Sequence, residues 1–171
     1  MVTDDGRLSP SQQRAWLSYM RVYHRMEYEM NRQLQAECGM SLGDYTVINA
    51  LTNAPRHRAP LTALATTIGW ERSRLSHFLQ RMSRRGYLER VPSETDGRVT
   101  DVVLTSAGMR AFRAAAPKHA AWIKQLFFSD LTGDQVDALA DILGTAHESI
   151  LRDGTLPRPE IDIPALSLIH I

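Results

Sequence analysis

Residues 61–88 read LTALATTIGWERSRLSHFLQRMSRRGYL, which contains two short helical patterns separated by a glycine. The first begins at Thr62, a capping residue, and ends at Gly69. The second runs from about Glu71 to Arg85 and is closed by Gly86. Its apolar positions, spaced by three and four residues, are Leu75, Phe78, Leu79 and Met82. Two short helices joined by a tight turn predict a helix-turn-helix.

The period of the sequence changes after this unit. Residues 87–91 and 100–104 are rich in β-branched and aromatic residues and predict two strands. The polar segment 92–99 between them contains Asp96-Gly97, a turn-forming pair. We therefore expect a β-hairpin, or wing, directly after the helix-turn-helix.

Helices are predicted on both sides of this unit. Capping residues and apolar spacing indicate helices over residues 9–39, 41–53, 105–127 and 132–153. Pro117 should kink or split the third of these. Residues 56–60 are expected to form a short loop, and residues 154–171 a loose tail. The predicted fold class is mainly α with a small β-wing.

Positive charge is concentrated in one part of the chain. The formal net charge is only +1, yet residues 56–98 contain nine arginines and four acidic residues, a net charge of +5. The remainder carries −4. This asymmetry favours a polyanionic partner, although an arginine-rich surface without a ligand would give the same pattern.

Spaced strings within these elements resemble the MarR family of bacterial transcription regulators. They are Leu64-Ala65-x-x-Ile68-Gly69, Ser73-x-x-Ser76-x-x-Leu79-x-Arg81-Met82-x-x-Arg85-Gly86-Tyr87-Leu88, Asp96-Gly97-Arg98 and Val103-Leu104-Thr105-x-x-Gly108. Residues 69–77 are also similar to an actinobacterial branch of that family. The resemblance spans residues 9–153 and implies one winged helix-turn-helix domain that forms a two-fold dimer. Residues 9–38 and 105–153 would be the dimerisation helices, and residues 41–104 the DNA-binding lobe.

The resemblance also implies a regulator, by expectation a repressor, that binds duplex DNA as a homodimer. The second helix of the helix-turn-helix would enter the major groove, where Arg74 can pair with guanine in bidentate fashion. At the wing, Arg98 would enter the minor groove and Asp96 would hold its guanidinium. Arg81, Arg84 and Arg85 would neutralise phosphate. The predicted DNA-binding residues are Arg72, Ser73, Arg74, Ser76, His77, Arg81, Arg84, Asp96 and Arg98.

Regulators of this family commonly respond to a ligand bound between the dimer helices and the DNA-binding lobe. A small aromatic or phenolic effector is expected here. The candidate lining residues are Trp16, Tyr23, His24, Tyr45 and Trp122. Each of these aromatic residues could equally be part of the core or the dimer interface.

The sequence offers little support for an enzyme. It contains no GxSxG, P-loop, GxGxxG or HExxH motif, so we expect neither a cofactor nor a metal. The alternatives are a winged helix that serves as an architectural or protein-interaction module and, less favoured, an enzyme with a site assembled from scattered residues. The single cysteine, Cys38, suits the cytoplasm and is expected to be inert, with thiol sensing as the less favoured reading.

The two ends of the sequence give further expectations. The first ten residues lack the basic and apolar regions of a signal peptide, and no apolar run is long enough to span a membrane. The last six residues, 166–171, resemble a translated sequencing adapter, so we favour an assembly artefact over a genuine apolar tail.

Overall fold

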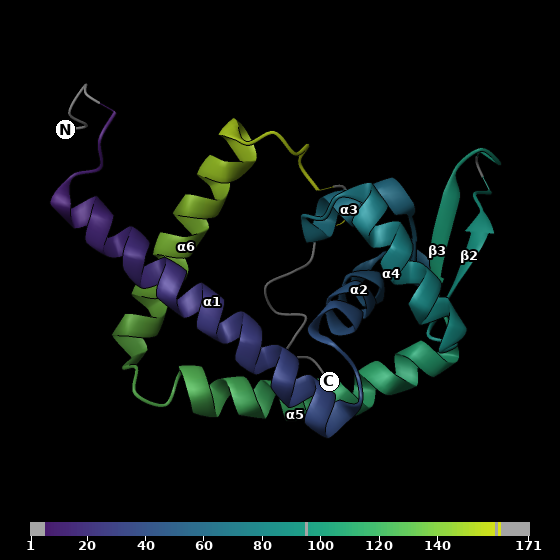
Figure 1. Ribbon diagram of the computed structural model, residues 1–171, viewed down its shortest axis with the longest axis horizontal. Helices are drawn as coiled ribbons and strands as arrows, with labels where there is room; N and C mark the ends of the chain where they lie inside the picture. Colours follow the sequence, from purple (N-terminus) through teal and green to yellow (C-terminus); the bar gives the residue numbers. More distant parts are fainter. Residues whose placement is uncertain (1–5, 95, 160, 162–171) are drawn as a thin grey trace.

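The computed structural model describes residues 6–94, 96–159 and 161, and this part of the chain contains six α-helices and one small sheet (Figure 1). The helices are α1 (Pro10–Cys38), α2 (Leu42–Asn53), α3 (Leu61–Ile68), α4 (Arg72–Arg84), α5 (Ser106–Phe127) and α6 (Gly133–Asp153). The strands are β1 (Arg58–Pro60), β2 (Leu88–Pro92) and β3 (Thr100–Leu104). The winged helix-turn-helix fold class is confirmed.

Side-chain caps explain where the long helices begin. Ser9, Ser41 and Thr132 each accept a hydrogen bond from the backbone N–H three residues later. The side chain at that later position bonds back to the N–H of the capping residue, which completes a capping box. Thr105 caps α5 through the N–H of Gly108 at 3.0 Å. These starts agree with those predicted from the sequence.

The core lies where the end of α1 meets α2, the helix-turn-helix, the sheet and α5. The largest fully buried side chains are mostly aliphatic: Leu34, Met40, Ile48, Leu51, Leu64, Leu75, Leu79, Met82 and Leu88. Burial of such side chains is the main favourable term in folding. Three of them belong to α4, so the inward face of that helix is fixed by the core.

Two predictions about the elements were wrong. Residues 56–60 are not only a loop, because β1 pairs antiparallel with β3 and makes a three-stranded sheet of order β1-β3-β2. Helix α3 begins at Leu61 rather than after Thr62, and its N-cap, Pro60, has no side chain that can accept a hydrogen bond. Pro117, expected to kink or split the third predicted helix, lies inside α5, which is continuous over Ser106–Phe127.

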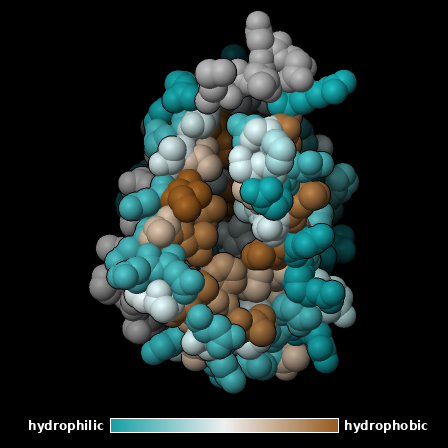
Figure 2. All heavy atoms as spheres, turned by 90° about the vertical axis from the view of Figure 1, so that its left-hand side faces the viewer, coloured by the Kyte–Doolittle hydropathy of each residue, from teal (hydrophilic) through white to brown (hydrophobic). Residues whose placement is uncertain are grey.

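The outer helices bury few residues within the single chain. Only Gln33 and Leu34 of the 29-residue α1 are buried, and α6 has no buried residue. Figure 2 shows apolar side chains gathered around a hollow on the face that includes these helices. None of the helices described is long and apolar enough to cross a membrane.

The tail after α6 is only partly described. Ile161 is 7% exposed and packs with the core, so the tail is not loose at that position. Residues 166–171, the expected artefact, lie outside the described residues.

Candidate nucleic-acid interface

A left-handed glycine makes the turn between the two helices of the helix-turn-helix. Gly69 has φ 67° and ψ 31°, a backbone conformation that residues with a Cβ rarely adopt. The N–H of Trp70 then donates to the carbonyl of Ala65 at 2.9 Å. Glu71 is the N-cap of α4, but its side chain makes no capping bond. This turn sets the direction in which α4 leaves α3.

Helix α4 presents one face to the core and the opposite face to solvent. Leu75, Leu79 and Met82 are fully buried, and Phe78 packs beside them. The outward residues are Arg72, Ser73, Arg74, His77, Arg81 and Arg84, which are exposed, and Ser76, which is partly exposed. The predicted recognition residues of this helix therefore share one accessible surface.

A glycine lets the start of α2 approach α4 closely. A Cβ built on Gly43 would lie 2.4 Å from the ring of Phe78 and 3.0 Å from Trp70. With any larger residue at this position, the rings of Phe78 and Trp70 would have to shift. The role of Gly43 could not be predicted from the sequence, because only the packing reveals the contact.

Two arginines of α4 lie over aromatic rings. The guanidinium carbon of Arg74 is 4.4 Å from the ring centroid of Trp70, and that of Arg81 is 4.1 Å from the ring centroid of Phe78. Trp70 and Phe78 themselves meet edge to face, with centroids 5.0 Å apart. These cation–π contacts give both arginines a preferred position in the unbound chain.

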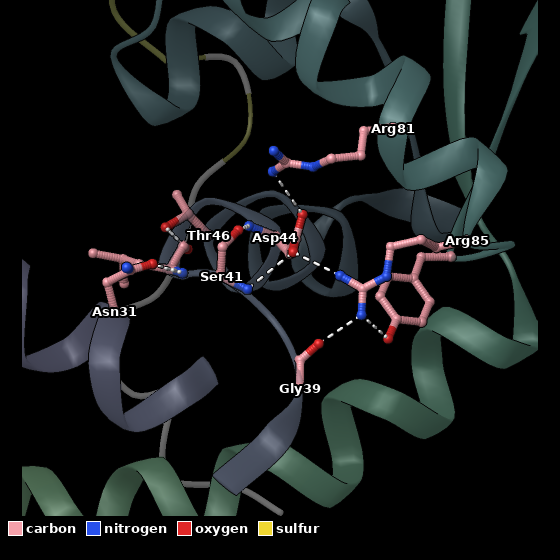
Figure 3. A network of polar contacts seen from close by, with 9 residues as sticks. Asn31, Gly39, Ser41, Asp44, Thr46, Arg81 and Arg85 are labelled. Atoms are coloured by element: carbon pink, nitrogen blue, oxygen red, sulfur yellow. Dashed lines mark hydrogen bonds and ion pairs between the residues drawn. The ribbon is translucent and has the colours of Figure 1, made fainter. Parts of the chain in front are cut away.

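A buried carboxylate anchors the C-terminal half of α4 (Figure 3). The Asp44 side chain is 2% exposed; its Oδ2 pairs with Arg85 at 3.0 Å and its Oδ1 with Arg81 at 3.4 Å. Arg85 also donates to the carbonyl oxygen of Gly39 and to the hydroxyl of Tyr87. Both arginines were expected to neutralise phosphate, whereas here they link α4 to the start of α2.

The wing is a regular antiparallel ribbon with a compact tip. Strands β2 and β3 pair from Leu88↔Leu104 to Pro92↔Thr100. At the tip, the N–H of Ser93 donates to the carbonyl of Val99 at 2.8 Å. Arg98 is exposed there. We expected Asp96 to hold the guanidinium of Arg98; instead, Asp96 Oδ1 accepts a hydrogen bond from the Arg98 backbone N–H at 2.9 Å.

The five candidate ligand-pocket residues occupy different places in the chain. Tyr45 is in the core, 5.3 Å from the ring of Phe112, and burial raises its pKa to about 12. Trp16 is about half exposed on α1. His24 lines an apolar groove between α1 and α5, and Trp122 lines a small cavity beside α1. Of the five residues, only Tyr23 lines the cavity between α1 and the helix-turn-helix.

A cavity of about 490 Å³ lies between α1 and the helix-turn-helix. Its wall on α1 is Tyr23, Glu27 and Asn31, and its opposite wall includes the two arginine–aromatic pairs of α4. It contains charged, hydroxyl and aromatic groups, a mixture that suits a small planar ligand with an acidic group.

Two other titratable groups lie near the core. Burial lowers the pKa of His119, which is 3% exposed. Partial burial raises the pKa of the Cys38 thiol, and Lys118 opposes this effect. A raised thiol pKa lowers the reactive thiolate fraction. Among the described residues there is no group of three or more side chains suited to hold a metal ion.

Comparison with known proteins identifies the family. The sequence profile of the MarR family matches residues 39–99. The crystal structure of Sco3205, a MarR family transcriptional regulator from Streptomyces coelicolor in complex with DNA, is 32% identical in sequence. The match covers 91% of this chain and 98% of that one, with a TM-score of 0.81. The chain belongs to the MarR family. Its members are transcriptional regulators.

Other MarR and regulator structures share the fold. AbsC, a MarR family transcriptional regulator from Streptomyces coelicolor, is 28% identical, and the match covers 84% of this chain and 97% of that one, with a TM-score of 0.77. The transcriptional regulator BldR from Sulfolobus solfataricus is 17% identical, with coverage of 84% and 100% and a TM-score of 0.73, so it shows the fold alone. No curated protein sequence matches the chain.

Within the MarR framework, three contributors were missed from the sequence. They are Trp70, which lies under Arg74; Asp44, which holds two arginines; and Arg58, which contacts the wing. The spacing of Trp70 and Arg74, four residues across the start of a helix, is a usable signal. The partners of Asp44 are 37 and 41 residues away, and no local pattern marks them.

Proposed function

We propose that this MarR family regulator binds duplex DNA through α4 and the wing. The observation that carries the proposal is the outward surface of α4, where Arg72, Arg74 and Arg84 are exposed, together with exposed Arg98 at the wing tip. An α-helix fits the major groove, and a β-hairpin beside it can reach the next minor groove. A narrow minor groove attracts arginine.

Each polar residue of this surface has a distinct proposed role. Arg74 reads guanine, and to do so it leaves the face of Trp70. His77, Ser73 and Ser76 contact base edges or phosphate, because they lie on the same side of α4. Arg72 and Arg84 neutralise phosphate, and Arg81 does so by exchanging its pair with Asp44 for the phosphate. Asp96 shapes the wing tip through the backbone of Arg98.

We propose that the outer helices form a two-fold dimer. Helix α6 buries no residue in the single chain, and Ile142, Leu143 and Ile150 on it are 65%, 45% and 66% exposed. Apolar surface of this extent is normally covered by a partner. Sco3205, the family member that is 32% identical to this chain, was crystallised in complex with DNA. A symmetric dimer would bind two half-sites about 10 base pairs apart.

The regulation proposed is release by a small aromatic or phenolic effector. The cavity of about 490 Å³ has the volume of typical small-ligand sites. Among the residues expected to line an effector pocket, Tyr23 is retained in the proposal. Trp16, His24, Tyr45 and Trp122 are assigned instead to other surfaces or to the core.

We propose that the protein works in the cytoplasm as a repressor.

Binding can be tested with duplexes selected from a random pool by the purified protein. DNase I footprinting should protect a pseudo-palindrome, and affinity should fall steeply as salt rises. Arg74→Ala should weaken binding by about 1–3 kcal/mol and relax base preference at one position of each half-site. Arg98→Ala should weaken binding at the flanking minor groove.

The matched control is Arg152→Ala on α6, an exposed arginine that lies outside the proposed DNA-binding surface. It should leave DNA affinity unchanged. Sedimentation should give a dimer for all of these proteins. A monomer without affinity for any duplex at low salt would refute the proposed function, and protection without base preference would favour an architectural role.

A further inference from the structure

Arg58 on β1 joins three segments at the base of the wing. Its Nε donates to Asp101 Oδ2 at 2.7 Å, one terminal nitrogen pairs with Glu94 Oε1 at 2.5 Å, and the other donates to the carbonyl of Pro92 at 3.1 Å. Pro92 is the last residue of β2, and Asp101 is the second residue of β3. One guanidinium therefore contacts both strands of the wing and the loop between them.

This arginine is unlike the exposed arginines of the proposed DNA surface. Its side chain is 17% exposed, and that of its partner Asp101 is 7% exposed. Charge-assisted hydrogen bonds of a guanidinium are short and directional, and they are worth more when partly shielded from water. All three nitrogens already have protein partners, so Arg58 is poorly placed to neutralise a phosphate.

The position of the wing tip depends on these contacts. An isolated two-stranded ribbon is only marginally stable, and beyond Asp101, where the pairing of β1 with β3 ends, the wing consists of two strands alone. On either side of Glu94 the ribbon is closed by two backbone hydrogen bonds, from the N–H of Ser93 to the carbonyl of Val99 and from the N–H of Val99 to the carbonyl of Asp96. Arg98 is bonded in turn to Asp96 through its backbone N–H. Displacement of the wing base would therefore move Arg98 as well.

We propose that Arg58 is a positioning residue of the MarR wing, which fixes where Arg98 meets the DNA without touching DNA itself. This inference rests on the proposed DNA-binding function. It assigns one arginine of the basic segment 56–98 to orientation rather than to phosphate contact. β1, which aligns Arg58 opposite Val103 of β3, has the role of carrying this side chain.

A double-mutant cycle tests the proposal on the selected duplex. Arg58→Lys retains the charge, but an ammonium cannot bond three partners in the planar arrangement of a guanidinium. It should weaken DNA binding by about tenfold, the scale of one lost charge-assisted contact. Combined with Arg98→Ala it should add almost nothing, because the contact that it positions is already gone. Combined with Arg74→Ala it should retain its full effect.

Arg56→Lys is the control, because Arg56 also pairs with Glu94 but its side chain is 76% exposed. It should leave affinity unchanged. Should Arg58→Lys fail to fold, Glu94→Ala removes one of the three contacts of Arg58 at an exposed partner. Its effect on DNA affinity should likewise disappear in the Arg98→Ala background.

Two outcomes would overturn the inference. One is an Arg58→Lys effect that is as large with Arg98→Ala as without it, as a direct phosphate contact would give. The other is no effect on affinity. Failure of the proposed function looks different, since the unsubstituted protein would then bind no duplex at all.

Discussion

The buried histidine of α5 illustrates how one residue is held in a single protonation state. His119 Nδ1 lies 2.8 Å from Gln33 Oε1, and Gln33 Nε2 donates to Glu37 at 3.0 Å. Because this arrangement leaves Oε1 of Gln33 as an acceptor, Nδ1 of His119 carries the proton. The ring is also stacked 5.9 Å from Trp122 and meets Tyr45 edge to face. Burial among these rings favours the neutral imidazole.

The stability of the protein should therefore decrease in mild acid. Burial lowers the pKa of His119 from 6.5, so below that pH the unfolded chain binds a proton that the folded chain resists. The contribution is fully present above about pH 6.5 and is lost as the pH falls toward the folded-state pKa. Urea unfolding at pH 7.5 and 5.5 measures this difference.

His119→Gln should reduce the loss of unfolding free energy between the two pH values. His147→Gln, at an exposed position of α6, should leave the loss unchanged. An equal loss in the protein and in His119→Gln would show that another group causes it.

At the level of elements, local signals were sufficient for most of the fold. The boxes at Ser9, Ser41 and Thr132 fix helix starts within a few residues of chain, and the sequence shows them directly. β1 could not be predicted in this way. Its three residues have no strand pattern of their own and are defined only by pairing with β3, more than 40 residues later.

The residues of the candidate site likewise divide into those that a local pattern predicts and those that only the folded chain brings together. The outward side of α4 follows from its apolar period, so the exposed arginines could be predicted. The sequence could not predict which of those arginines already pair with a carboxylate, because Asp44 reaches α4 only after the chain has folded. The contacts of Arg58 with Glu94 and Asp101, 36 and 43 residues away, were missed for the same reason.

Asp44 and Arg85 link α2 to α4, and loss of either partner should lower the free energy of unfolding by a different amount. Arg85→Ala leaves the buried Asp44 carboxylate with only Arg81 and the capping bond of α2 as partners, which should lower the free energy of unfolding by about 2 kcal/mol. Asp44→Asn should cost only about 1 kcal/mol, because the amide can still cap α2 and both arginines are accessible enough to be hydrated. Chemical denaturation of the two variants measures the order.

The double variant should cost less than the sum of the two single changes, since the remaining groups have no interaction left to lose. Arg84→Ala, an exposed neighbour on α4, is the control and should stay within about 0.5 kcal/mol of the unsubstituted protein. Asp44→Asn more damaging than Arg85→Ala would contradict the dominance of the buried charge.

Across the whole molecule, the long outer helix α1 and the DNA-binding lobe meet at the cavity between α1 and α4. Tyr23 and Asn31 of α1 face Arg74 and Phe78 of α4 across it. A ligand that contacts both walls favours one relative placement of the two parts. It can also compete for Arg74, which the proposed base contact requires. Binding of effector and DNA should therefore be negatively coupled, and by the same factor in both directions.

That coupling can be measured with 4-hydroxybenzoate as the probe, an aromatic acid that carries a phenol. Calorimetry should show saturable binding to the free protein, and saturating probe should weaken affinity for the selected duplex by about 5–150-fold. Tyr23→Ala should lower probe affinity and remove the effect on DNA while leaving probe-free DNA affinity intact, because Tyr23 lies on α1. Tyr28→Ala, on the same helix but lining the apolar groove beside α5, should change neither. Probe binding that persists in Tyr23→Ala and fails in Tyr28→Ala would place the effector in that groove, where a partner subunit's helices are expected, and would separate regulation from the arginines of α4.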